Sequence, residues 1–326
     1  MSQSAKNNRA NLLSYDGKRG NVLNKTSFLF LILSFLLCFW IVWHYRELFH
    51  LILKIKPGYA ILLFLLFAVI QVVNGYRIFT IVRFFGLRMK RFDWIGIPYV
   101  TSYLNYLPIN AGLGATAVFL KKQYDLPYTK FVSISGALLL IQMFCFSTLG
   151  LFLMGLIRII KGPISYYLDG AFLLILLAII VFRFVPVGFI RGESRITNWF
   201  KSSLDGFDDI RKDRSLIVSL MLQSYIQLGL TGLTIYFTFM SLGLLVNYLD
   251  GLLIGIVTSV LKQQLLFFMP GQLGIREVFI AGITKIIQGS FGDGVVVAFT
   301  DRIVTGVTTI ILGNFFIWKF MQRLKG

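Results

Sequence analysis

The chain has few of the residues on which most catalytic and metal sites are built. Its 326 residues include two cysteines and two histidines, and no segment has the glycine-rich pattern of a phosphate-binding Walker loop. Cys38 and Cys145 both fall in apolar runs, which excludes a disulfide framework, and His44 and His50 lack the cysteine or carboxylate spacing of a metal site. The sequence therefore predicts no cofactor, no metal and no ATP-driven step carried out by this chain alone.

Acidic residues are also scarce, with 14 Asp and Glu against 32 Lys and Arg and a formal net charge of +18. A strongly basic chain often binds nucleic acid through one basic face. Here the basic residues are scattered between apolar runs, so no nucleic-acid partner is expected. They are better explained as determinants of membrane orientation and as contacts with anionic lipids.

Long apolar runs are the feature that the chain has in abundance. Hydrophobic residues make up 56% of it, and several runs exceed the roughly 20 residues that cross a bilayer. The predicted fold class is an all-α polytopic membrane protein. The predicted full spans are 26–44, 58–82, 131–157, 166–190, 215–241 and 295–318.

Two further apolar stretches, 92–120 and 249–288, each contain a Pro-x-x-x-Gly segment. These segments run from Pro108 to Gly112 and from Pro270 to Gly274, nearly half the chain apart. A helix break at bilayer depth frees backbone groups that lipid cannot satisfy, so it persists only where protein or a hydrated cavity receives those groups. A matched pair of breaks predicts two repeats and a binding site between them.

The topology depends on whether these broken stretches cross the membrane. If both crossed once, there would be eight spans, and the segment 191–214, with six Lys and Arg, would be extracytoplasmic against the positive-inside rule. Re-entrant stretches give six full spans, two inverted repeats and cytoplasmic N- and C-termini. The expected units are a disordered basic cytoplasmic tail at 1–25, a first repeat at 26–157 and a second at 158–326, with 191–214 as an amphipathic linker. The expected location is the cell (inner or cytoplasmic) membrane.

The most distinctive motif is Arg276-Glu277 after Gly274. A helix beginning there would direct free N–H groups and the positive end of its dipole towards the break, with Arg276 as a fixed charge in an anion site. Glu277 suits the first turn and is expected to hold Arg276. The alternative is a snorkelling arginine at an ordinary helix start, but a charge at bilayer depth costs roughly 2.5–3.5 kcal/mol and usually has a task.

Other polar residues within the spans extend this candidate site. Asp301 is a counter-ion for Arg302, Arg276 or Lys262, with a structural ion pair between helices as the alternative, and Arg77 either joins the site or snorkels. The candidate substrate-binding residues are Arg276, Glu277, Pro270, Gly271, Gly274, Asp301, Arg302, Lys262, Asn105, Pro108, Asn110, Gly112 and Arg77.

These residues resemble the transmembrane, flippase-like region of lysylphosphatidylglycerol synthases and the stand-alone membrane proteins built from that region. The resemblance is carried by Pro270-Gly271, Gly274 and Arg276-Glu277, by Arg302 in the next helix, and by Asn105, Pro108 and Gly112 earlier in the chain. The first repeat departs from the family pattern, because Asn110-Ala-Gly-Leu-Gly114 stands where relatives carry Arg-x-Gly-Glu. The resemblance implies lipid handling or translocation without the aminoacyl transfer of the larger enzymes, whose catalytic domain is soluble.

The sequence favours a transporter or flippase for an anionic amphiphile, either a phospholipid or a polyprenyl-phosphate-linked sugar. Its expected partners are membrane lipids, mainly anionic ones. One alternative is an integral-membrane enzyme that transfers a group to a lipid headgroup with Glu277 or Asp301 as general base, although no nucleophile or metal cluster supports it. The other is a non-catalytic scaffold for a lipid-modifying glycosyltransferase.

Overall fold

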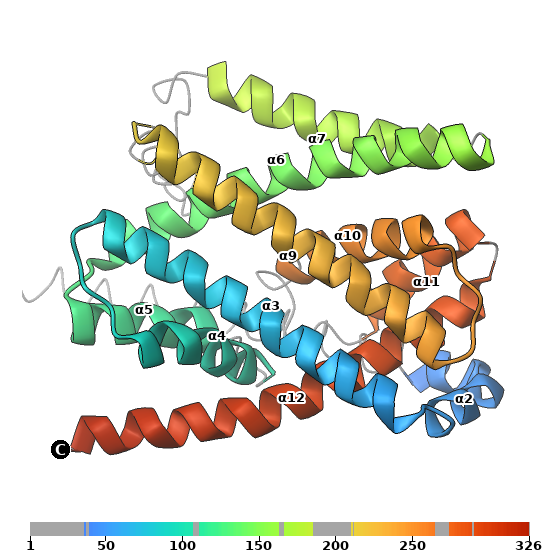
Figure 1. Ribbon diagram of the computed structural model, residues 1–326, viewed down its shortest axis with the longest axis horizontal. Helices are drawn as coiled ribbons and strands as arrows, with labels where there is room; N and C mark the ends of the chain where they lie inside the picture. Colours follow the sequence, from blue (N-terminus) through green and yellow to red (C-terminus); the bar gives the residue numbers. More distant parts are fainter. Residues whose placement is uncertain are drawn as a thin grey trace, which may run out of the picture.

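The computed structural model describes residues 39–106, 111–162, 166–184, 212–264, 274–288 and 290–325, together with Leu36 and Ile210. Over these residues the protein is all-α (Figure 1). Four of the described helices are long and apolar enough to cross a membrane. They are α3 (Pro57–Phe84), α6 (Tyr128–Lys161), α9 (Arg214–Ser241) and α12 (Phe291–Lys325), and they confirm four of the predicted spans.

The other two predicted spans are described only in part. Helix α7 (Tyr166–Phe184) covers most of the predicted span 166–190. Most of the predicted span 26–44 and of the predicted linker 191–214 lies outside the described residues. The short helices η1 (Arg46–Phe49) and α2 (His50–Leu53) follow the predicted span 26–44 in the chain. Both pack against α12.

The first broken stretch folds as two antiparallel helices, α4 (Arg91–Asn105) and α5 (Ala111–Tyr124), which we call the first hairpin. The Tyr124 hydroxyl donates to Asp93 at the open end of the hairpin. The Thr101 and Thr116 hydroxyls lie 2.5 Å apart, and near the tip the Gly112 N–H donates to the Asn105 side-chain oxygen at 3.0 Å. Both outer ends of this stretch therefore lie at the same end of the bundle, as a re-entrant element requires.

Gly112 is needed because the two helices of the first hairpin approach so closely. A Cβ at this position would lie 2.1 Å from the Thr101 carbonyl oxygen and 2.4 Å from the Asn105 side-chain oxygen. Both distances are far shorter than any real carbon contact. A Cβ added at Gly114, on the same helix, would enter open space.

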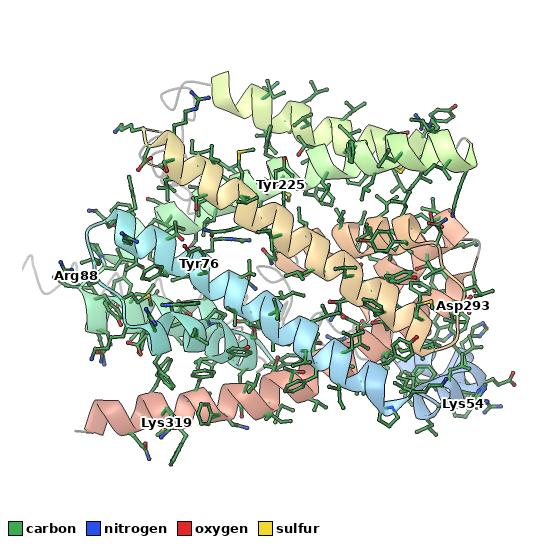
Figure 2. The ribbon with its side chains drawn as sticks, viewed as in Figure 1. Lys54, Tyr76, Arg88, Tyr225, Asp293 and Lys319 are labelled. Carbon is green, nitrogen blue, oxygen red and sulfur yellow. The ribbon has the colours of Figure 1, made fainter. Side chains whose placement is uncertain are left out.

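The second broken stretch forms α10 (Tyr248–Gln264) and α11 (Ile275–Gln288), which pack together and are called the second hairpin. Figure 2 places Arg88, in the turn before the first hairpin, at one end of the long axis, and Asp293, just after the second hairpin, at the opposite end. The two hairpins thus open towards opposite ends of the bundle (Figure 1). Hairpins that open towards opposite ends fit a pair of inverted repeats. The inverted repeats stay a prediction, and so does the assignment of one end of the bundle to the cytoplasmic face.

Helix α9 lies at the centre of the bundle, with α3, α6 and α10 packed against it. Its contact with α10 is made backbone to backbone, because a Cβ on Gly255 would lie 2.5 Å from the Gly232 Cα. Small residues at such crossings are typical of membrane helices, which gain little by burying apolar side chains away from equally apolar lipid. Large apolar side chains face outwards instead, as Ile61 on α3 and Leu174 on α7 do.

Candidate functional site

A polar cavity of about 230 Å³ lies where the tip of the first hairpin, the start of α11 and the middle of α12 meet. Side chains of α3, α9 and α10 complete its wall. Most of its lining residues are polar or charged, although the surrounding bundle is apolar. The polar lining residues are Gln71, Asn74, Ser102, Asn105, Tyr106, Gln227, Thr231, Thr234, Ser259, Arg276, Asp301, Arg302, Thr305 and Thr309.

Two buried ion pairs join α11 to α12 beside this cavity. Arg276 pairs with Asp301, and Arg302 pairs with Glu277. The side chains of Asp301 and Glu277 are 1% and 0% exposed. Because an isolated charge in such a place would be costly, each arginine and its carboxylate make the burial of the other tolerable.

Glu277 has a second contact, at the beginning of its own helix. Its other carboxylate oxygen accepts a hydrogen bond from the Gly274 N–H at 2.8 Å, and Gly274 has a φ of +82°, a conformation that favours glycine. The sequence predicted that Glu277 would hold Arg276. In the structure, Glu277 pairs with Arg302 instead, and Arg276 pairs with Asp301. Adjacent residues on a helix point in different directions, so Arg276 and Glu277 do not face each other and each pairs with a residue of α12.

Arg77 lies in the middle of the bundle, where α3, α6 and α9 meet. It is 6% exposed, so its guanidinium does not extend to the surface of the described bundle. Its Nη1 donates to the Gln142 side-chain oxygen at 3.2 Å, and its Nη2 donates to the side-chain oxygen of Gln227. Gln227 in turn lines the polar cavity, which places Arg77 directly behind the cavity wall.

The structure thus gathers most of the candidate residues that it describes. Arg276, Asp301, Arg302 and Asn105 line the cavity, and Glu277, Gly112 and Arg77 each bond to a lining residue. Gly274 bonds to Glu277. Pro108, Asn110, Pro270, Gly271 and the side chain of Lys262 lie outside the described residues.

Sequence reasoning missed three buried glutamines. Gln71, Gln142 and Gln227 lie close to the middle residues of α3, α6 and α9. Gln71 donates to the Ser102 hydroxyl at 2.9 Å, which joins α3 to the first hairpin. A glutamine close to the midpoint of each of three apolar spans was the signal available in the sequence, because an amide in the bilayer centre needs a polar partner.

The family model described as lysylphosphatidylglycerol synthase TM region matches residues 27–313. The chain belongs to this family. The match includes both hairpins and every residue that lines the polar cavity. Membership in the lysylphosphatidylglycerol synthase TM region family confirms the resemblance and connects this multi-pass membrane protein with lipid handling. No curated protein and no solved structure gives a significant match to the chain.

Proposed function

We propose that this protein binds the headgroup of an anionic amphiphile in the polar cavity and passes it across the membrane as a transporter or flippase. The observation that carries the proposal is the cavity itself, a polar chamber with charged walls inside a bundle whose outer surface is apolar. Intramembrane ionisable residues that face such a cavity mark substrate pathways in membrane proteins. The substrate class is a phospholipid or a polyprenyl-phosphate-linked sugar.

The electrostatics of the cavity support an anionic headgroup. Both arginines line the cavity together with Asp301, whereas Glu277 is not part of the lining. The Nε of Arg276 is buried and, among the described residues, has no hydrogen-bond partner. A guanidinium group carries five donors, so Arg276 keeps donors for a ligand oxygen while it remains paired with Asp301.

The arrangement of the hairpins supports movement between leaflets. The tip of the first hairpin and the start of α11 border the same cavity, although the two hairpins open towards opposite ends of the bundle. Discontinuous helices that meet at a central site from opposite faces are a recurrent design of alternating-access transporters. Displacing either hairpin would open the cavity towards a different leaflet.

The test is leaflet exchange of fluorescent anionic and zwitterionic lipids in liposomes that contain the purified protein. The informative variant is the double substitution Arg276→Met with Asp301→Leu, which removes both charges of one cavity ion pair. The matched control is Arg158→Met with Asp169→Leu, because this pair joins α6 to α7 away from the cavity. We expect the wild type and the control to exchange the anionic lipid, and the cavity variant to be roughly tenfold slower or worse.

Equal exchange by the folded cavity variant and the control would contradict the proposed headgroup site. No exchange of any lipid by the folded wild-type protein would contradict transport. The headgroup transferase and the glycosyltransferase scaffold would then be the functions to test.

A further inference from the structure

Arg77 differs from the two arginines of the polar cavity in having only neutral partners. In the part of the chain that the structure describes, no carboxylate pairs with it, and its two hydrogen bonds go to the amide oxygens of Gln142 and Gln227. Its Nε is buried and has no partner among the described residues. An amide oxygen satisfies a donor but does not cancel a charge, so a buried cation without a counter-ion is an unstable arrangement unless an anion binds there.

A second cavity, also of about 230 Å³, lies on the other side of Arg77. Arg77 and Gln142 form part of its wall, and most of the remaining lining is aliphatic, including Ile81, Leu120 and Leu138. We call it the apolar cavity. Its two threonines, Thr101 and Thr116, bond to each other and to backbone carbonyls, which leaves hydrocarbon as the main surface that it offers.

One hydrogen-bonded cluster connects the walls of the two cavities. Gln227 lines the polar cavity, Gln142 lines the apolar cavity, and Arg77 donates to both, while the Gln142 amide nitrogen lies 3.4 Å from the Gln227 oxygen. A molecule that occupied both cavities across this cluster would pass Arg77 where its polar part joins its apolar part. In a phospholipid or a polyprenyl phosphate, the phosphate lies at that junction.

We propose that Arg77 binds the phosphate at the junction of an amphiphile whose headgroup occupies the polar cavity and whose hydrocarbon chain enters the apolar cavity. This assignment rests on the proposed function and adds a second cationic subsite to it. The amide N–H groups of Gln142 and Gln227 supply further donors once their oxygens turn away. A fatty-acid carboxylate fits less well, because it ends at the charge and leaves the polar cavity unfilled.

Binding can be measured without transport, as a rise in the melting temperature of the purified full chain in neutral maltoside detergent. Dodecyl phosphate offers both the anion and the chain, inorganic phosphate offers the anion alone, and dodecanol offers the chain alone. We expect dodecyl phosphate to stabilise the wild type more strongly than either of the other two at equal concentration. If inorganic phosphate stabilises equally, the site belongs to a free anion and the proposal is overturned.

The variant is Arg77→Gln, and the matched control is Arg158→Gln, which removes an arginine far from both cavities. We expect Arg77→Gln to weaken dodecyl phosphate binding roughly tenfold or more, because a charge-assisted contact is lost, and the control to leave it unchanged. Without ligand, Arg77→Gln should melt at the same or a higher temperature, since it removes a buried charge without a counter-ion. A lower melting temperature with unchanged ligand binding would show a purely structural role and overturn the assignment.

A second variant covers the case in which Arg77→Gln does not fold. Ser135 lines the apolar cavity and its hydroxyl donates to the Phe131 carbonyl, so Ser135→Phe fills that cavity and leaves the cation in place. We expect it to abolish stabilisation by dodecyl phosphate, and retained stabilisation would overturn the proposal. If lipid exchange occurs but neither variant alters dodecyl phosphate binding, the Arg77 assignment fails and the transporter stands. If Arg77 binds dodecyl phosphate but no lipid is exchanged, the subsite stands and transport fails.

Discussion

The two hairpins place different chemistry at the same cavity. Among the described residues of the first hairpin, those that reach the cavity are neutral, namely Ser102, Asn105 and Tyr106. Asn105 is occupied with the hairpin's own backbone, since it accepts from the Gly112 N–H. The second hairpin contributes Ser259 and the charged Arg276 to the lining. Glu277 lies behind Arg302, and both Arg276 and Glu277 form ion pairs with the next helix, α12.

This difference shows how each hairpin is held in place. Tight packing and internal hydrogen bonds shape the first, and Tyr106 reaches Thr305 of α12 through one hydroxyl contact of 3.2 Å. Two buried charge pairs fix the start of α11 to α12. We therefore expect charge substitutions to affect mainly the second hairpin and steric substitutions to affect mainly the first.

The largest effect is expected for Glu277→Gln in the second hairpin. The substitution keeps the shape and an acceptor for the Gly274 N–H but removes the buried negative charge that pairs with Arg302, which should cost about 3–5 kcal/mol of unfolding free energy. Chemical unfolding in neutral detergent measures it. Asp169→Asn breaks a more exposed pair between α6 and α7 and should cost about 1 kcal/mol or less. Equal losses in the two variants would contradict the special role of the cavity pairs.

A smaller effect is expected for Gly112→Ala in the first hairpin. The added Cβ meets the Thr101 carbonyl, so α4 and α5 must separate, at a cost of about 1–3 kcal/mol. Gly114→Ala is the matched control on the same helix, where open space lets alanine stabilise by up to about 1 kcal/mol. Opposite shifts in melting temperature are expected, and similar shifts would mean that the close approach does not determine the hairpin's geometry.

The smallest effect is expected for Tyr106→Phe, which removes the hydroxyl contact with Thr305 and leaves the ring. The loss should be about 0.5–1.5 kcal/mol, as for an ordinary hydrogen bond. Thr305→Val removes the same contact from the α12 side and tests the assignment in a double-mutant cycle. Additive effects of the two substitutions would show that the contact does not hold the hairpin tip.

Hydropathy and helix-breaking residues were sufficient to predict much of the architecture. The four long spans follow from runs of apolar residues, and the Pro-x-x-x-Gly segments correctly divide each broken stretch into two helices. These features are local properties of the sequence, because lipid imposes the same length and composition on each span. The Arg-Glu motif likewise placed charge at the start of α11.

Pairing was harder to predict, because it depends on which helix faces meet. Asp301 and Arg302 are neighbours in the chain, yet each bonds to a different residue of α11. Nothing local in the sequence distinguishes this pattern from Glu277 holding Arg276. The partners of Arg77 are still more remote, at 65 and 150 residues along the chain, so its environment follows only from the assembled bundle.

That last separation also bears on how the protein is made. Arg77 is synthesised in α3, whereas Gln227 lies 150 residues later in α9. Until α9 has entered the membrane, the emerging chain holds a guanidinium that lacks one of its two partners. Early insertion intermediates therefore carry a cost that the hydrogen bond to Gln227 later lowers. A nascent chain halted before α9 should accordingly be a better target for membrane quality control than one halted after it.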